Sequence, residues 1–403
     1  MPCFAIPPDP AAPMKNPIDA TPFTLAVADP VLADLKTRLA QTRWPNEAAT
    51  TPWRYGASLD YVRRAVDHWQ HRYDWRRVEA GINRWPQYLA TIRGETIHFI
   101  MERGSGPNPL PLILTHGWPG SFAEFLEVIE PLAHPERFGG NEKDAFTVIV
   151  PSLPGFGCSP SPRLPVTPQQ IATIWHELMT GVLGCEHYVA QGGDWGAIVT
   201  SYLALNHPQA LAAIHLNTVG FLPNLTAAQP LDAEEDAWRI ANDRQRIRET
   251  GYVALQSTKP QTLAYALTDS PAGLAAWILE KFHGWTVGVT DPPKPVDPPY
   301  PLDHLLTNVM LYWLNGINGA NWMYTSFQDP TLRIPPQGQR VEVPTGMLIC
   351  PSDLSLPAPD RWIQRMYNLA DRRDAPSGGH FIAFEEPAYF VKELRQFFSR
   401  YRR

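Results

Sequence analysis

The chain is poor in cysteine, which argues against a fold held together by disulfide bonds or by zinc. It has four cysteines in 403 residues, and no two of them form a CxxC pair. This spacing is typical of a protein that works in the reducing cytoplasm. The four residues are Cys3, Cys158, Cys185 and Cys350.

Strong net charge and long apolar runs are also missing. The formal charge is −6, which is mild for this length and argues against nucleic acid or an anionic membrane as partner. No apolar run approaches the roughly 20 residues of a membrane span. Residues 1–20 lack a basic segment followed by an apolar core, so they are not a secretory signal. We therefore expect no stable membrane anchor, and a loosely ordered N-terminal arm over residues 1–20.

Hydrophobic residues make up 44% of the chain, enough for a sizeable core. In the first 95 residues, Phe23, Leu25 and Val27 alternate as in a short strand, and residues 59–73 carry apolar side chains at helical spacing. Residues 1–95 therefore read as an arm followed by a mostly helical segment.

The pattern then changes to short apolar runs that alternate with helices over residues 96–220. Such alternation is typical of a parallel α/β sheet. Between 221 and 336 the strand signal vanishes and helical patterns dominate, and residues 337–403 return to a strand and a final amphipathic helix. The sequence predicts an α/β fold with a mostly parallel central sheet, in two core parts (96–220 and 337–403), with an inserted all-helical lid (221–336).

One segment combines a sharp turn with a nucleophile. Residues 192–196 (GGDWG) lie between a strand-like run and a helix, which is the G-x-Nuc-x-G elbow of α/β-hydrolases with Asp194 in the nucleophile position. A carboxylate that attacks an sp3 carbon forms an alkyl ester, and water can then cleave this ester at the carbonyl carbon of the enzyme. The expected electrophile is an activated alkyl carbon such as an epoxide or a haloalkane.

Partners for Asp194 occur in the order that this fold requires. Residues 116–120 (HGWPG) follow a predicted strand, so the backbone N–H of Trp118, with that of Trp195, is expected to form the oxyanion hole. His380 takes the place of the base that deprotonates water, and Asp353 follows a strand at the place of the carboxylate that orients it. Competing carboxylates, which we expect in or after a helical stretch, are Asp360, Asp371 and Asp374.

These segments resemble the microsomal-type epoxide hydrolases, a branch of the α/β-hydrolase fold with an N-terminal meander. The resemblance covers nearly the whole chain from about Thr21. It rests on residues 42–45 (TRWP), 73–76 (YDWR), 116–121 (HGWPGS), 192–196 (GGDWG), 257–260 (STKP), 351–354 (PSDL), 379–381 (GHF) and 385–387 (EEP).

The resemblance also implies two lid tyrosines that donate hydrogen bonds to the epoxide oxygen. The matching positions are Tyr252 and Tyr324. Phenols with a pKa near 10 are neutral donors at neutral pH, so they can protonate the alkoxide that ring opening creates. Tyr265 and Tyr312 are the local competitors.

We therefore expect an epoxide hydrolase that converts a small apolar epoxide and water to a vicinal diol without metal or organic cofactor. A homodimer is compatible with the sequence. A haloalkane or haloacid dehalogenase with the same Asp nucleophile is the alternative, and its halide would need indole donors in the lid. A non-catalytic interaction protein on this scaffold is the third reading. The candidate indoles are Trp277, Trp285, Trp313 and Trp322.

Overall fold

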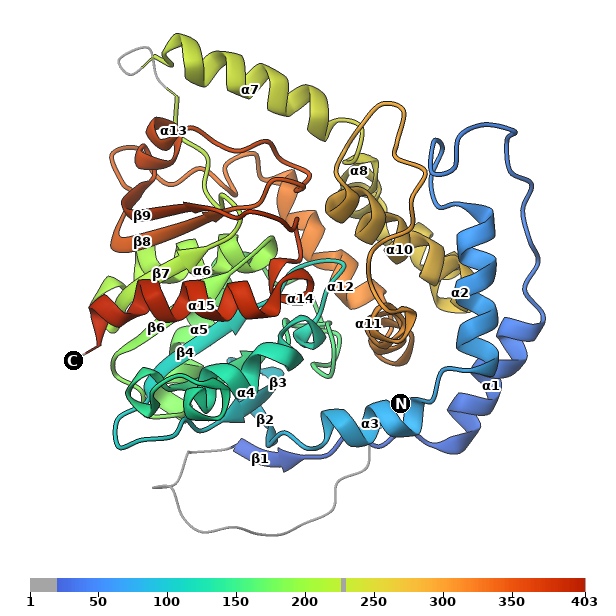
Figure 1. Cartoon of the computed structure of the whole chain (residues 1–403), viewed down its shortest axis with the longest axis horizontal. Coiled ribbons are helices and arrows are strands. Elements are labelled where there is room, and N and C mark those ends of the chain that lie inside the picture. The colour runs from blue at the N-terminus through green and yellow to red at the C-terminus, as the bar shows by residue number, and fades with distance from the viewer. Residues whose placement is uncertain (1–19, 226–229, 403) are drawn as a thin grey trace.

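The computed structural model describes residues 20–225 and 230–402, and a nine-stranded sheet lies at its centre (Figure 1). The strand order is β1-β2-β3-β5-β4-β6-β7-β8-β9. Strands β1, β2, β3 and β5 pair antiparallel, and every other neighbouring pair is parallel. The predicted fold class is confirmed. The strands are β1 (Ala20–Phe23), β2 (Gln87–Ile92), β3 (Glu95–Glu102), β4 (Leu110–Thr115), β5 (Phe146–Pro151), β6 (Tyr188–Gly192), β7 (Leu211–Leu216), β8 (Val341–Ile349) and β9 (Tyr367–Asp374).

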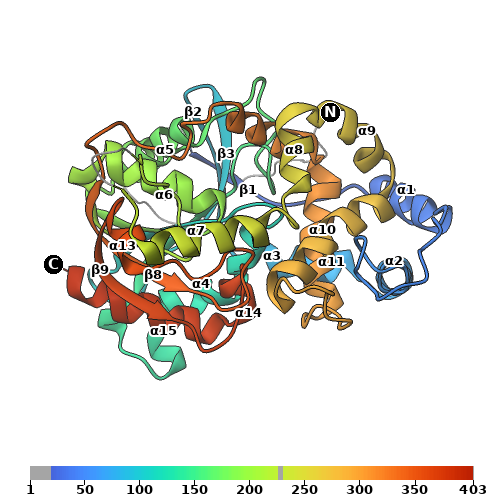
Figure 2. The same cartoon turned by 90° about the horizontal axis from the view of Figure 1, so that it is seen from above.

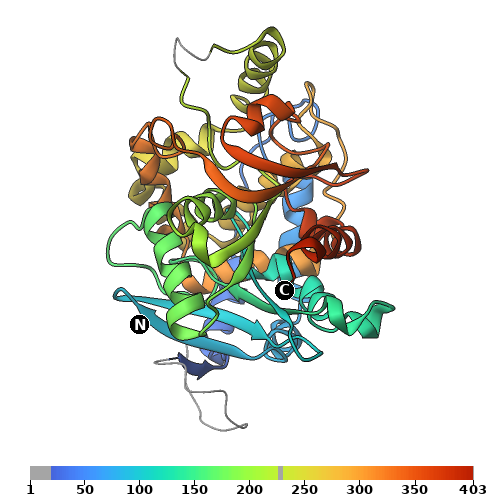
Figure 3. The same ribbon diagram turned by 90° about the vertical axis from the view of Figure 1, so that its left-hand side faces the viewer.

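The central strands β4 to β7 are mostly apolar and mostly buried, because helices cover both faces of the sheet. Figure 3 shows the strongly twisted sheet between two helical layers. One layer holds α4 (Leu126–Ala133) and α15 (Pro387–Phe398), and the other holds α5 (Pro168–Glu177) and α6 (Trp195–Asn206). Helix α6 is buried from residue 195 to residue 204, which places it deep against the sheet.

The chain between β7 and β8 forms helices and loops and no strand in its described residues, 217–225 and 230–340. These helices gather beside the carboxyl ends of the parallel strands, as Figures 1 and 2 show. They are α7 (Ala233–Arg246), α8 (Gly251–Thr258), α9 (Pro260–Asp269), α10 (Pro271–Val287), α11 (Leu302–Asn315) and α12 (Asn318–Trp322), with a following 3-10 turn, η6 (Met323–Gln328).

The N-terminal helices pack on this helical insertion. Helix α2 lies against α10 and α11, and α1 lies against α10 and α2 (Figure 2). Arg38 forms an ion pair with Asp269 at 2.8 Å, and Arg64 forms one with Asp297 at 2.9 Å. The N-terminal segment therefore packs against the helical insertion and is joined to it by these ion pairs. Its helices are α1 (Asp29–Ala40), α2 (Leu59–His71) and α3 (Trp75–Ile82), and the remaining short helices of the chain are α13 (Asp360–Gln364) and α14 (Ile382–Glu385).

The strand expected over residues 23–27 is shorter than its alternation suggests. Strand β1 ends at Phe23, although Leu25 and Val27 are buried as the pattern requires. Their backbone N–H groups donate to side chains, to Oδ1 of Asn83 at 2.9 Å and to Oε1 of Glu79 at 2.6 Å. The alternation therefore predicts correctly which side chains are buried. Residues 25 and 27 are not part of a strand, because their N–H groups bond to side-chain oxygens instead of to the carbonyl groups of a neighbouring strand.

Two strands were not expected from the sequence. Strand β2 lies in the N-terminal segment read as mostly helical, and β9 forms the far edge of the sheet. Asp360 begins α13, and Asp371 and Asp374 come after that helix as expected, but both lie in the unexpected strand β9. An edge strand with charged side chains lacks the apolar run by which buried strands are found.

The division into an N-terminal part, two core parts and a lid stays a prediction. Among the described residues, no helix combines the length and the apolar character needed to cross a bilayer. The expected loose arm, up to residue 19, lies outside the described residues.

Candidate active site

Asp194 stands at the sharp turn between β6 and α6. Its backbone has φ 51° and ψ −123°, a left-handed conformation that costs a non-glycine residue energy. The neighbouring Gly196 has no room for a side chain, since a Cβ there would lie 2.0 Å from the carbonyl oxygen of Thr115. The strained turn and the close approach of β4 together make the elbow that the sequence predicts.

The carboxylate of Asp194 is held by backbone donors. The Trp118 N–H donates to Oδ1 over 2.9 Å, and the Trp195 N–H also favours the ionised form. Burial works against this charge, but the nearby His380 and the two N–H groups outweigh it and lower the pKa of Asp194. The nucleophile is therefore ionised at neutral pH.

His380 bridges two carboxylates. Its Nδ1 donates to Oδ1 of Asp353 at 2.8 Å, and its Nε2 faces Oδ2 of Asp194 at 3.4 Å. Burial of the imidazole opposes its charge, yet Asp353 and Asp194 outweigh the burial and raise the pKa of His380 to about 10. The structure thus brings together all three residues that the elbow argument selected.

The competing carboxylates are engaged elsewhere. Asp360 and Asp374 both pair with Arg372, at 2.6 and 3.0 Å, and Asp371 pairs with Arg373 at 3.3 Å. None of these three contacts involves His380.

The loop that carries His380 is fixed by a residue that sequence reasoning gave no role. The carboxylate of Glu385 accepts hydrogen bonds from the backbone N–H of Gly379 and of Phe381, each at 2.8 Å. The His380 N–H donates to the carbonyl oxygen of Trp285 at 2.9 Å. These bonds on both sides of the histidine hold its ring between the two aspartates.

Tyr252, on α8, and Tyr324, in η6, lie together over the nucleophile. Their ring centroids are 5.6 Å apart, and both side chains are buried. Burial, with the charge of Asp194 adding to it, raises the pKa of both phenols above the ordinary value. Both are therefore neutral hydrogen-bond donors over the whole physiological pH range.

Neither competing tyrosine offers a free hydroxyl to this site. Tyr265 is 73% exposed. The Tyr312 hydroxyl donates to the carbonyl oxygen of Gly120 at 2.7 Å.

Aromatic rings enclose the nucleophile. The Trp118 ring stacks on Tyr252 with centroids 4.5 Å apart, and Trp195 meets Tyr324 edge-on at 4.9 Å. Trp285 lies 4.8 Å from the His380 ring. Such a shell suits an apolar ligand.

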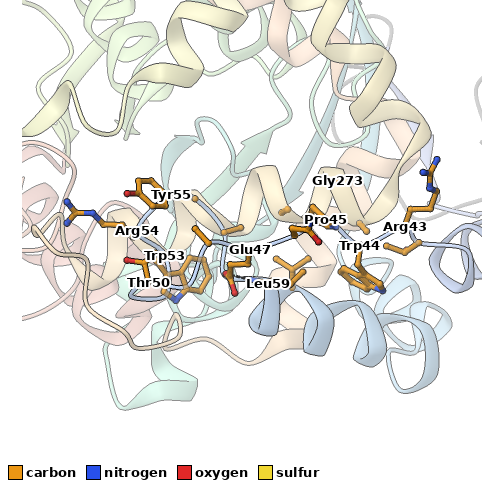
Figure 4. A pocket seen from close by; sticks show the side chains of 18 of the residues that line it. Arg43, Trp44, Pro45, Glu47, Thr50, Trp53, Arg54, Tyr55, Leu59 and Gly273 are labelled. Carbon is orange, nitrogen blue, oxygen red and sulfur yellow. Dashed lines mark hydrogen bonds between the residues drawn. The ribbon is translucent and has the colours of Figure 1, made fainter.

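Two cavities reach residues of the site, and a third lies apart from them. The smallest, of about 20 Å³, is lined by Asp194, His380, Glu124 and Asn217 among others. A second, of about 340 Å³, lies under α7 and reaches Asp353 and Asn217. A third, of about 370 Å³, lies between residues 42–62 and the start of α10, with Trp44, Trp53 and Tyr55 on its wall (Figure 4). None of the candidate catalytic residues lines this third cavity.

Comparison with known proteins shows the family of the chain. The chain matches the family description "Epoxide hydrolase N terminus" over residues 20–125 and "alpha/beta hydrolase fold" over residues 111–271. A putative epoxide hydrolase of Stigmatella aurantiaca is 43% identical over 384 residues, which cover 95% of this chain and 85% of the relative. Epoxide hydrolase 1 of Oryctolagus cuniculus is 32% identical, with 93% and 88% covered.

Solved structures give the same result. The epoxide hydrolase of Aspergillus niger superimposes with a TM-score of 0.82 at 30% identity, over 96% of this chain and 98% of that one. The juvenile hormone epoxide hydrolase of Bombyx mori gives 0.80 at 29% identity, over 96% and 95%. Sheet, elbow and comparisons define an α/β-hydrolase. Within that class, the chain belongs to the epoxide hydrolase family.

Proposed function

We propose that this protein hydrolyses an epoxide to a vicinal diol through an ester on Asp194. The proposal rests mainly on the position of the His380 imidazole. One of its nitrogens faces the ionised nucleophile Asp194, and the other is hydrogen-bonded to the carboxylate of Asp353. A dehalogenase with the same nucleophile is disfavoured by family membership. The Trp277 indole, one of its candidate halide donors, is already bound to Oε1 of Gln256 at 3.1 Å.

In the first step a carboxylate oxygen of Asp194 attacks one epoxide carbon and the C–O bond of the ring breaks. The electron pair of that bond goes to the epoxide oxygen, which takes a proton from Tyr252 or Tyr324. The proton of the His380 imidazolium then restores the phenol. Asp194 has become a neutral glycol monoester and His380 a neutral base, so charge is conserved.

Ester formation itself prepares His380 for the second step. The charge of Asp194 is one of the two causes that raise the pKa of His380 in the free protein. Once Asp194 is an ester this cause is lost, so the pKa falls toward the range of a base that works at neutral pH. Asp353 still fixes the tautomer and stabilises the imidazolium that forms.

In the second step His380 takes a proton from water while the water oxygen bonds to the Asp194 carbonyl carbon. The N–H groups of Trp118 and Trp195 stabilise the resulting oxyanion. Collapse of this intermediate breaks the bond to the diol oxygen, which leaves with a proton from His380. The other proton of the attacking water is then on the Asp194 carboxyl group. It passes to His380, which restores the Asp194 carboxylate and the His380 imidazolium.

The aromatic shell around Asp194 supports an apolar epoxide as substrate. The test is diol formation from styrene oxide beside chloride release from a haloalkane. We expect diol and no chloride, and Asp194→Ala should abolish diol formation. Chloride without diol would contradict the proposal. The cytoplasmic location and the homodimer stay predictions, which cell fractionation and light scattering test.

A further inference from the structure

One carboxyl group near the triad has no role in the steps above. Glu124 lies in the short helix η1 (Phe122–Phe125), and its Oε1 atom is buried without a hydrogen-bond partner in the described structure. Most buried polar side-chain atoms are hydrogen-bonded, so an unpaired carboxyl oxygen calls for an explanation.

Glu124 lies beside the reacting groups. It lines the cavity of about 20 Å³ together with Asp194 and His380. This volume is the size of one water molecule rather than of a substrate. The Nε2 atom of His380 is also buried, and its nearest acceptor, Oδ2 of Asp194, is 3.4 Å away. The cavity therefore has polar atoms on several sides, as a bound water requires.

We propose that Glu124 is a positioning residue for the water that hydrolyses the Asp194 ester. Its carboxyl oxygen accepts one proton of the water in a hydrogen bond, while the other proton points to Nε2 of His380. With both protons engaged, a lone pair of the water faces the ester carbonyl carbon. No proton is transferred to Glu124, and the inference rests on the proposed ester mechanism.

The electrostatics of the cavity fit this role. Burial raises the pKa of Glu124 to about 8, against the opposing influence of His380. A neutral carboxyl keeps an oxygen lone pair to accept a hydrogen bond. In the ester intermediate it holds the water without adding a second negative charge to that of Asp353 near His380, which would keep the imidazole protonated and unfit as a base.

A purely structural role accounts poorly for the residue. The carboxyl group accepts a backbone hydrogen bond from Ser121, but its Oε1 atom stays buried without a partner. An unpaired buried polar atom costs stability, whereas an apolar side chain of similar volume does not. Gly120 also leaves space for it, since a Cβ at that position would lie 1.4 Å from Oε1 of Glu124. The fold thus accommodates a costly group next to the reaction.

The experiment separates the two chemical steps. Rapid quenching with mass spectrometry of the Asp194 peptide gives the rates of ester formation and of ester hydrolysis. Glu124→Leu should slow hydrolysis by about tenfold or more, the effect of one lost hydrogen bond, and leave ester formation unchanged. The ester should accumulate, and kcat and KM should fall together. Glu124→Gln retains a carbonyl oxygen and should recover most of the hydrolysis rate.

Controls keep the test decisive. Glu127→Leu changes an exposed glutamate on the next helix and should leave both steps as they are. If Glu124→Leu does not fold, Glu124→Ala takes its place with the same expectation. Hydrolysis at the original rate, or an equal loss in both steps, overturns the inference. His380→Gln should accumulate the ester in any case. Its failure to do so would contradict the proposed mechanism itself rather than the role of Glu124.

Discussion

Gly120 and Glu124 form a close pair at the edge of the catalytic site. A Cβ on Gly120 would lie 1.4 Å from Oε1 of Glu124 and 2.5 Å from its carboxyl carbon. The obstacle is the end of a flexible side chain and not backbone, and Gly120 has no positive φ. A larger residue at 120 would therefore displace the carboxyl group without unfolding the turn.

This pair gives the first prediction. Gly120→Ala should slow ester hydrolysis more than ester formation, because the displaced carboxyl group no longer reaches the water cavity. Rapid quenching of both steps checks it. In Glu124→Leu, the further change Gly120→Ala should have a much smaller effect on hydrolysis, since residues in contact act non-additively. Equal effects in both backgrounds would refute the coupling.

The second prediction concerns stability and pH. The pKa of Glu124 is about 8 in the folded protein against an ordinary value of 4.5. Between these values the folded protein retains a proton that the unfolded chain has released, so this group lowers stability as pH rises. Glu124→Leu removes that effect.

The measurement is thermal unfolding of both proteins at about pH 5 and about pH 8. Glu124→Leu should raise Tm, and by more at the higher pH. Glu127→Leu, on the exposed surface, should show no such pH-dependent gain. A gain for Glu124→Leu that is the same at both pH values would argue against a raised pKa of this carboxyl.

The third prediction concerns Asp353. Asp353→Asn removes a charge that raises the pKa of His380 and permits the wrong ring tautomer. Turnover should fall by about a hundredfold or more, mostly in ester hydrolysis. Asp371→Asn is the matched control, since Asp371 pairs with Arg373, and it should retain full activity. If the two variants were equally active, Asp353 would have no role in orienting His380.

The fourth prediction concerns the two phenols. Tyr252→Phe and Tyr324→Phe should each slow ester formation by about tenfold or more, because a hydrogen bond to the developing alkoxide is lost. The double variant should be slower than either one. Ester formation is measured by rapid quenching, with the exposed Tyr265→Phe as control. Unchanged ester formation in the double variant would exclude the tyrosines as donors.

The sequence predicts the elbow, the histidine and the orienting aspartate because parallel α/β topology places strand-end residues at one edge of the sheet. Asp194 and Asp353 each follow a strand, so their proximity to His380 follows from topology. Tyr252 and Tyr324 lie in the helical insertion, where no periodicity selects them, and only the family resemblance did so.

Other features depend on burial, which local sequence does not reveal. Glu124 follows HGWPG by a few residues and reads as an ordinary polar residue until its surroundings are known. Strand β9, with the sequence YNLADRRD, lacks the apolar run of a buried strand. Leu25 and Val27 are predicted to be buried, yet their hydrogen bonds go to side chains from residues far along the chain.

The most direct test of the covalent mechanism follows the oxygen atoms in a single turnover. An excess of unlabelled protein is mixed with an epoxide in water enriched in the heavy oxygen isotope, and both products are analysed by mass spectrometry. The account predicts that the Asp194 side chain gains the heavy oxygen and that the diol contains none, since its new oxygen comes from the carboxylate. Heavy oxygen in the diol, with an unlabelled Asp194, would contradict it.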